Sequence, residues 1–376
     1  MKSTLNKALA IAIVAAPVAA HAMEAKMYGT VNKALMVYDD GRSTDTTIVD
    51  NSNETTRFGI GAEQKLDNGL TASFLFENEM SSNKSNVITQ STTANQSFTP
   101  TNGSSPSLTE RIARVGIAGN WGALFIGQQD IASDDAFTHD LAAASSVINA
   151  NVASMGGALI YKRKTGATFT NLSVGGTDLT TNLFAQGNNG DLGSADSIRY
   201  NSPVWNGWNG SLSTSQGGNV DVNVRYAKDY GVVAVDGALA HTMINSNVTT
   251  AANEQTGATL GSISMKHQSG LGATLAYATQ HLDKKAADVK EAEGWYGKVG
   301  YAWDAYGVAA EYGNFKDPVA HATIRQELNV MGVGAEWNMG NGVTAGALYR
   351  NMNPKVTGVS NDETIDIYSL SMRVKF

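Results

Sequence analysis

The sequence contains no cysteine and only six prolines in 376 residues. Without cysteine, a disulfide framework cannot hold the fold together. Long apolar runs are also missing, because the longest, residues 8–20, is too short to cross a bilayer as a helix. Basic residues are scarce, with 27 Lys and Arg against 34 Asp and Glu. This balance argues against a nucleic-acid-binding protein, which needs a basic face.

The N-terminus has the features of a secretory signal peptide. Lys2 and Lys7 precede the apolar run, and Ala20-His21-Ala22 forms a small-x-small cleavage site. We therefore predict that residues 1–22 are removed and that residues 23–376 form a single domain. Loss of Lys2 and Lys7 leaves 25 basic against 34 acidic residues, a formal charge of −9.

The last segment, residues 364–376, alternates strictly between two kinds of side chain. Tyr368, Leu370, Met372 and Val374 are interleaved with Ser369, Ser371, Arg373 and Lys375. Successive side chains of a strand point to opposite faces, so this pattern predicts a strand with one apolar and one polar face.

Similar alternating segments fill the rest of the chain and are joined by connections of two kinds. Every second connection is short, such as Asp67-Asn68-Gly69, whose residues favour tight turns. The others are mostly long and polar: residues 39–56, 80–109, 129–195, 245–256, 281–293, 316–326 and 351–363. Short turns on one side and long loops on the other are typical of outer-membrane barrels. The pattern predicts an all-β protein, a transmembrane antiparallel β-barrel of about sixteen strands.

Tryptophan placement agrees with this prediction. Five of the six tryptophans lie at or near the short turns, where an interfacial aromatic girdle would form. They are Trp121, Trp205, Trp208, Trp303 and Trp337. A soluble sandwich would not require so regular an asymmetry of loop length.

Several local motifs, taken in order, resemble those of the Gram-negative general diffusion porins. They are residues 27–31 (MYGTV), 57–61 (RFGIG) with 66–70 (LDNGL), 114–117 (RVGI) leading to 127–129 (GQQ), 197–203 (SIRYNSP) with Gly207, and the terminal Phe376. The resemblance covers essentially the whole chain after residue 22. It implies a 16-stranded barrel, usually trimeric, whose long third loop folds into the lumen. It also implies that Tyr368 and Phe376 form the signal read by the barrel-assembly machinery.

The resemblance further implies a passive, water-filled outer-membrane channel for small hydrophilic solutes and ions, with no catalytic residues, cofactor or metal. In that family, basic residues on the barrel wall form one side of the constriction, and the matched motifs place Arg57 and Arg199 at these positions. Alternation puts both on the face opposite Phe58 and Ile198, and therefore in the lumen. Arg114 is a further candidate on the same grounds.

The acidic side of the constriction is expected early in loop 129–195. Asp130, Asp134, Asp135 and Asp140 are concentrated there. Many relatives carry Lys and Arg at positions that Thr30 and Gln128 occupy here. Fewer wall cations and an acidic chain together predict a mild preference for cations.

Three alternatives stay open at this point. Residues 158–164 and 167–174 resemble an extra hairpin bearing Lys162, Arg163 and Lys164, which would give about eighteen strands if it joined the wall. We favour sixteen; the basic triplet could line the mouth of the pore or contact lipopolysaccharide phosphates. The acidic loops could bind Ca²⁺, although no EF-hand order is present. The channel could also be specific for a sugar or an anion, or the barrel could be an adhesin.

Overall fold

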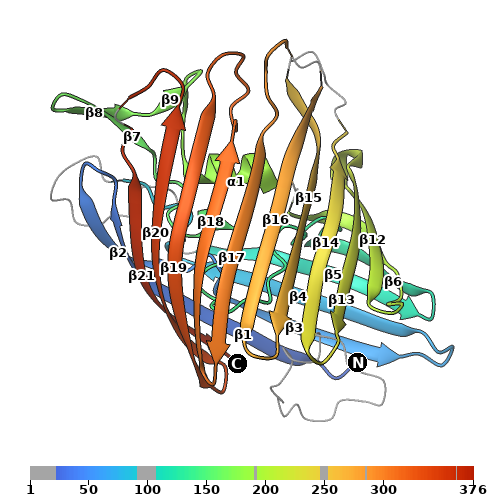
Figure 1. Cartoon of the computed structure of the whole chain (residues 1–376). Coiled ribbons are helices and arrows are strands. Elements are labelled where there is room, and N and C mark those ends of the chain that lie inside the picture. Colours follow the sequence, from blue (N-terminus) through green and yellow to red (C-terminus); the bar gives the residue numbers. More distant parts are fainter. Residues whose placement is uncertain (1–22, 91–106, 190–192, 246–252, 284–285, 361) are drawn as a thin grey trace.

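The computed structural model describes residues 23–90, 107–189, 193–245, 253–283, 286–360 and 362–376. The predicted signal peptide, residues 1–22, lies outside this range, as does part of the loop predicted at 80–109. Almost all of the regular secondary structure in the described residues is strand, which confirms the predicted class (Figure 1). No helix among the described residues is long and apolar enough to cross a membrane.

Sixteen strands form the wall of a barrel. They are β1 (Lys26–Asp39), β3 (Arg57–Lys65), β4 (Thr71–Ser81), β5 (Ser107–Gly119), β6 (Gly122–Asp130), β11 (Ser194–Asn201), β12 (Trp208–Ser215), β13 (Val220–Asp229), β14 (Val233–Met243), β15 (Glu254–His267), β16 (Leu271–Asp283), β17 (Glu293–Trp303), β18 (Tyr306–Lys316), β19 (Gln326–Gly340), β20 (Val343–Val356) and β21 (Ile365–Lys375).

The barrel closes where its first and last strands meet. Along one edge β1 pairs with β21, from Thr30 opposite Lys375 to Asp39 opposite Asp366. Along the other edge of β1, its first residues, Lys26–Thr30, pair with β3. All pairings in the wall are antiparallel and the ring of sixteen strands is closed, so neighbouring strands satisfy one another's backbone groups, as a lipid environment requires.

The prediction that residues 39–56 form a loop is wrong. They contain β2 (Thr44–Asp50), which pairs with the upper part of β1 from Lys33 to Asp39. Thr47 and Val49 are buried while Ile48 is 71% exposed, so β2 alternates like a wall strand. It belongs to the same sheet without taking part in the closed ring.

The hairpin predicted at 158–174 exists but does not join the wall. It comprises β7 (Lys162–Thr165) and β8 (Thr168–Asn171), which pair with each other. A second small pair, β9 (Ser173–Val174) and β10 (Thr177–Asp178), follows it. The prediction of sixteen wall strands is therefore confirmed, and the alternative of eighteen wall strands is wrong.

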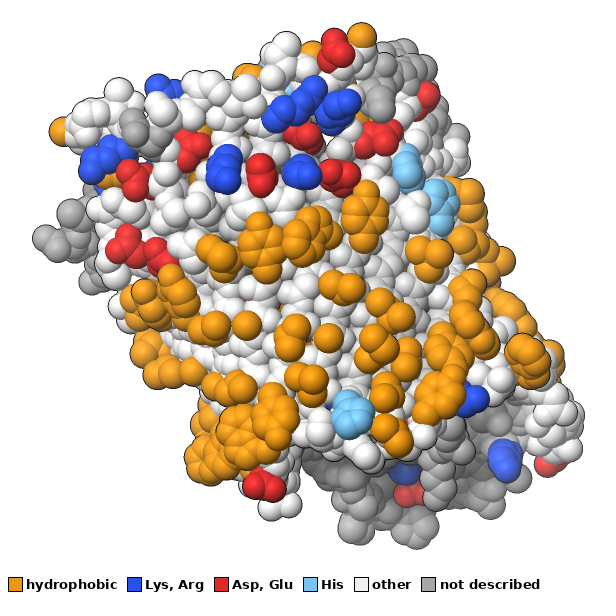
Figure 2. Space-filling model, viewed as in Figure 1, with side chains coloured by type: hydrophobic (Ala, Val, Ile, Leu, Met, Phe, Trp, Pro, Cys, Tyr) orange, Lys and Arg blue, Asp and Glu red, His pale blue; other side chains and the backbone are white. Residues whose placement is uncertain are grey.

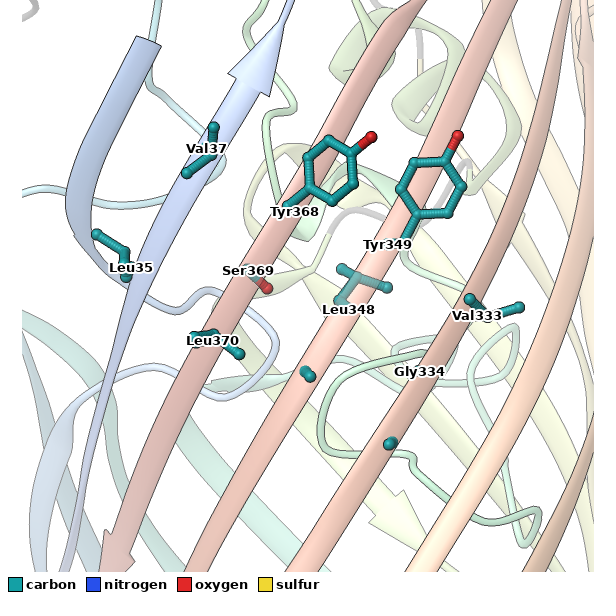
Figure 3. Close-up of a pocket in the computed structure, with 11 residues that line it drawn as sticks. Leu35, Val37, Val333, Gly334, Leu348, Tyr349, Tyr368, Ser369 and Leu370 are labelled. Atoms are coloured by element: carbon teal, nitrogen blue, oxygen red, sulfur yellow. The ribbon is translucent and has the colours of Figure 1, made fainter. Parts of the chain in front are cut away.

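The outer face of the barrel is apolar. In β21, Tyr368, Leu370, Met372 and Val374 are 37–62% exposed, whereas Ser369 is 5% exposed, as alternation predicted. Figure 3 shows Leu35, Leu370 and Val333 lining one shallow groove on this outer face, with the rings of Tyr368 and Tyr349 near its upper end.

Aromatic side chains border this apolar surface at both ends. The five predicted tryptophans lie at the short-turn end of the wall and are 41–76% exposed. Near the long-loop end are the exposed rings of Tyr277, Trp295, Tyr312, Tyr349 and Tyr368. Figure 2 shows charged side chains gathered beyond the apolar zone at that end. Two aromatic borders around an apolar zone are typical of a transmembrane barrel.

Much of the connection between β6 and β11 lies inside the barrel, whereas the β7–β8 hairpin projects at the long-loop rim (Figure 1). The buried residues of this connection, including Ile148, Met155, Leu159, Tyr161 and Phe184, form one apolar cluster with inward-facing residues of the wall such as Tyr296, Phe315, Met352 and Ile367. This connection also contains the short 3-10 turn Val152–Ser154 and α1 (Thr181–Asn189), which contacts β15 to β18. The main apolar core is therefore built between the third long loop and the inner wall.

Candidate pore constriction

Residues 131–154, which we term the belt, run along the inner wall from β12 to β20. Near the start, the Ala132 amide donates to Ser213 Oγ on β12 at 2.8 Å, and Asn223 Nδ2 on β13 donates to the Ala132 carbonyl at 2.9 Å. Ser262 and Ser264 on β15 hold the next part, through the carbonyl of Ala136 and the amide of Leu141. Further along, Ser146 Oγ donates to Glu336 on β19 at 2.6 Å. Inward-facing polar side chains on successive strands thus fix the path of the belt.

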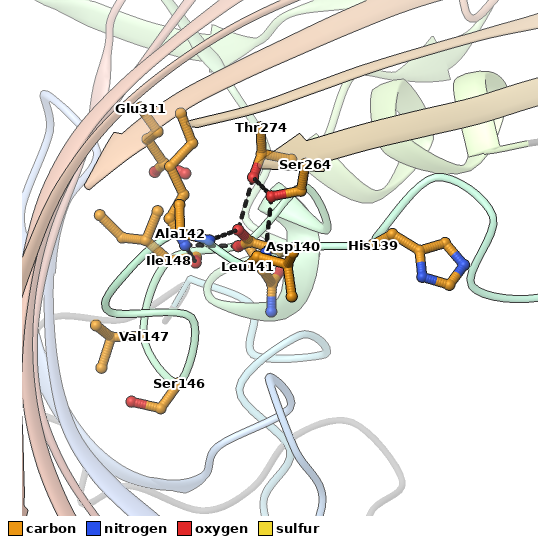
Figure 4. A network of polar contacts seen from close by, with 12 residues as sticks. His139, Asp140, Leu141, Ala142, Ser146, Val147, Ile148, Ser264, Thr274 and Glu311 are labelled. Atoms are coloured by element: carbon orange, nitrogen blue, oxygen red, sulfur yellow. Dashed lines mark hydrogen bonds and ion pairs between the residues drawn. The ribbon is translucent and has the colours of Figure 1, made fainter. Parts of the chain in front are cut away.

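Two buried ion pairs reinforce this path. Lys298 Nζ on β17 lies 2.5 Å from Asp140 Oδ2 and also donates to the carbonyl of Ile148, while Thr274 Oγ1 donates to Asp140 Oδ1 (Figure 4). The lysine side chain is completely buried. One wall residue therefore holds two points of the belt.

The second pair joins Arg350 on β20 to Glu311 on β18. Arg350 Nε and Nη2 donate to the two carboxylate oxygens at 2.7 and 3.2 Å, and both side chains are completely buried. Nη1 donates to the carbonyl of Val152 at 2.9 Å, and Tyr296 Oη donates to Glu311 at 2.9 Å. Such multiply bonded charges are tolerated in an interior because each hydrogen-bonding group has a partner.

Of the predicted basic residues, Arg57 lies beside the buried carboxylate of Glu77 on β4, on another part of the wall. Arg111 Nη1 lies 2.6 Å from Glu77 Oε1, and Arg57 Nε lies 3.6 Å from Oε2. Tyr28 Oη donates to Glu77 at 2.6 Å. Glu77 therefore offsets the charge of Arg57 and Arg111 and orients both guanidinium groups.

Arg114 and Arg199 make mainly neutral contacts. Arg199 Nη1 donates to the carbonyls of Asp130 and Ile131 at 2.8 and 3.1 Å, and Nε donates to Asn201 Oδ1 at 2.9 Å. Arg114 stacks over the ring of Phe125 at 4.5 Å from its centroid and reaches Gln129 Oε1 at 3.4 Å. Arg199 consequently holds the start of the belt as well as facing the lumen.

The four predicted acidic residues divide into two groups. Asp130 accepts from Ser194 Oγ at 2.6 Å and lies 3.5 Å from Arg111, and Asp134 and Asp135 are near enough for their charges to act on Arg199. Asp135 is exposed and has a positive φ of 64°. Asp140, in contrast, is only 6% exposed and is held by Lys298. The structure brings three of the four acids to the arginines and places the fourth in the anchor of the belt.

Sequence reasoning missed Arg111 and Glu77. Strict alternation from Arg114 puts Arg111 on the lipid side, but the register between β4 and β5 shifts beside Arg111, which turns it inward. A bulge of this kind re-aims a side chain without any clear sequence signal. Glu77 could have been found, because alternation places it opposite Phe76 and hence inside.

Glu54, in the connection between β2 and β3, was also missed. Its carboxylate lies 2.7 Å from Arg373 Nη1 and 2.8 Å from Lys375 Nζ, so the polar face of β21 is the one that faces inward. Burial alone would raise the pKa of Glu54. The hydrogen bond from Lys375 and the positive charges of Lys375, Arg373 and Arg57 outweigh burial and bring that pKa below its usual value. This connection therefore carries a carboxylate that stays ionised at neutral pH.

Among the described residues, no group of three or more His, Cys, Asp or Glu side chains is arranged to hold a metal ion.

The family profile described as Gram-negative porin matches residues 8–357. No curated protein matches the sequence significantly. An anion-selective porin from Comamonas acidovorans has a similar structure, with a TM-score of 0.59 and 14% identity, covering 94% of this chain and 99% of that one. A loop-deletion mutant of OmpT, an outer membrane protein of Vibrio cholerae, has a TM-score of 0.59 at 12% identity, with the same coverage of both chains. The outer membrane channel DcaP of Acinetobacter baumannii has a TM-score of 0.55 at 10% identity and covers 94% of this chain and 97% of that one.

Proposed function

Because this chain belongs to the Gram-negative porin family, and so to the bacterial outer membrane, we propose that it is a water-filled channel for passive diffusion of small hydrophilic solutes and ions. The observation that carries the proposal is a closed lipid-compatible barrel with charged side chains facing inward around the start of the belt. Arg57, Arg114 and Arg199 form the basic side of the proposed constriction. Acidic residues near them provide the opposite charge, as channels require for selection by charge. A channel accounts for this arrangement without any enzymatic activity.

Solute flux tests the channel itself. Liposomes containing the purified protein should swell in sugars, at rates that fall as the sugar becomes larger. The absence of size-dependent swelling would contradict a general diffusion channel.

A mild preference for cations is our proposal for its selectivity. Glu77 offsets two of the arginines, whereas Asp135 is exposed. The chain after residue 22 also carries a formal charge of −9. We expect reversal potentials in a KCl gradient to favour K⁺ over Cl⁻, and an anion-selective result would contradict this part of the proposal.

We also propose that the protein is a homotrimer, on the strength of an ion pair on the outer face. Lys33 lies midway along β1, between the exposed Val31 and Leu35, and bonds Asp50 of β2. A charged lysine facing lipid at mid-membrane costs about 2–4 kcal/mol. Contact with another subunit would remove this cost. Covalent cross-linking in the membrane should yield trimers, and monomers alone would count against the proposal.

Other partners follow from the same assignment. Outer-membrane lipid would surround the apolar outer face of the barrel, and lipopolysaccharide would contact the charged side chains that border this face. The barrel-assembly machinery would insert the chain by reading Tyr368 and Phe376 after removal of residues 1–22.

A further inference from the structure

Five consecutive strands of the wall, β16 to β20, each place a glycine against the belt. They are Gly272, Gly300, Gly307, Gly334 and Gly346, which we call the glycine track. A Cβ atom at Gly272 would lie 2.9 Å from Cα of Ala142, and one at Gly300 would lie 2.8 Å from the amide nitrogen of Ala143. Backbone of the belt therefore occupies the space that a side chain would fill.

The rest of the track meets belt side chains in the same way. A Cβ at Gly307 would lie 3.2 Å from Cβ of Ala143, and one at Gly334 would lie 2.8 Å from Cδ1 of Ile148. At Gly346 it would overlap Cγ1 of Val147. Figure 4 shows Ala142, Val147 and Ile148 on this part of the belt.

The backbone of these strands does not itself require glycine. None of the five has a positive φ. Glycine inside a strand weakens it, because its unfolded chain is more flexible and it has no side chain to pack. A glycine inside a strand marks a bulge, a tight bend or the close approach of another segment. The pairing register is unbroken at all five glycines, and the belt is the segment that approaches them.

We infer that the glycine track sets the bore of the channel by letting the belt lie flush with the wall. The inference rests on the proposed channel function. The belt lies between the wall and the lumen, so a side chain in the track displaces it inward. It cannot slide along the wall instead, because Lys298, two residues before Gly300, holds both Asp140 and Ile148. The displaced belt would narrow the pore, because it would move towards the opposite wall, where Arg57 and Arg199 lie.

The test compares two valines on one strand. Gly300→Val adds a β-branched side chain, which suits a strand, directly beneath the belt. Gly297→Val is the control, since Gly297 lies on the outward side of β17, where the nearest atom to a new Cβ is Leu275 Cδ2 at an ordinary 3.5 Å. Single-channel conductance and liposome swelling are measured for both variants and the wild type.

We expect Gly300→Val to lose conductance and to exclude sugars that the wild type admits, while Gly297→Val behaves as the wild type. If Gly300→Val fails to form a heat-resistant barrel, Gly300→Ala and Gly272→Ala are measured in its place. We expect these alanine variants to lose conductance to a smaller extent. Unchanged conductance in a folded track variant would overturn the inference and leave the channel function standing. Increased conductance would overturn it too, because the belt would have been released. A wild type that forms no channel would overturn both.

Discussion

Lys298 Nζ and Asp140 Oδ2 lie 2.5 Å apart although 158 residues separate them in the chain. The lysine extends from β17 in the wall, and the aspartate lies on the belt. Both side chains are almost fully removed from water, with exposures of 0% and 6%. The pair consequently fastens the belt to the wall at one defined register.

Replacing Lys298 with Met should loosen this attachment. Removal of one partner from a buried pair leaves an uncompensated charge and typically costs about 3–5 kcal/mol. We expect the barrel to unfold at lower denaturant concentration and single-channel current to become noisier as the belt moves. Lys316→Met is the control, because Lys316 pairs with Glu293 on the exposed rim at 3.4 Å and its loss should cost little. Equal stability of the two variants would contradict the anchoring role of Lys298.

The pair between Arg350 and Glu311 predicts a different pattern. Arg350→Met should destabilise strongly, since Glu311 then keeps a buried charge and the Val152 carbonyl loses its donor. The double variant Arg350→Met with Glu311→Leu should recover part of the loss, because apolar replacement of a whole buried pair is often tolerated. Denaturant unfolding of both variants measures the recovery. A double variant less stable than Arg350→Met alone would contradict this account.

Selectivity should respond to the buried Glu77. Glu77→Gln keeps the shape and accepts a hydrogen bond from Tyr28, but it no longer offsets Arg57 and Arg111. We expect reversal potentials to shift towards Cl⁻. Glu63→Gln on the neighbouring strand, exposed at the short-turn end of β3, should leave the potential unchanged. An equal shift in both variants would show that only net charge matters.

Much of the fold could be predicted because it depends on the alternation of side chains. The two faces of β21, the tight turn at Asp67–Gly69 and the inward position of Arg199 all follow from a period of two residues and from turn chemistry. The short strand β2 was harder to predict, since seven residues rich in threonine resemble a polar loop.

The candidate site was predictable only in part, because its details depend on contacts between distant segments. The inward turn of Arg111 comes from a bulge, and the pairing of Asp140 depends on a strand more than 150 residues away. The glycine track is visible in the sequence as scattered glycines, but its meaning appears only when the path of the belt is known. Composition and alternation describe the wall; the third loop is specified by tertiary packing.

The C-terminal residue should matter for assembly. Phe376 exchanges two backbone hydrogen bonds with Gly29, at 2.9 and 3.0 Å, and so extends the seam between β21 and β1. We expect deletion of Phe376 to lower the amount of folded, heat-resistant barrel in the outer membrane, with unchanged ion selectivity in the molecules that do assemble. Phe376→Tyr, which keeps an aromatic ring and the backbone, serves as the control. Normal assembly without Phe376 would contradict its role as an assembly signal.

Arg199 offers the sharpest test of the proposed constriction. Its guanidinium donates to the backbone carbonyls of Asp130 and Ile131 at the start of the belt, and the charges of Asp134 and Asp135 act on it from nearby, so it lies where basic and acidic residues meet. Arg199→Ala should therefore increase the preference for K⁺ over Cl⁻ in a KCl gradient, with little effect on assembly. Lys228→Ala removes an equal charge from the outward side of the short-turn end, where Lys228 bonds Asn206, and should leave the ratio unchanged. Because the two variants have the same net charge, only a difference between them locates the selective field at Arg199, and identical reversal potentials would show that Arg199 is not at the constriction.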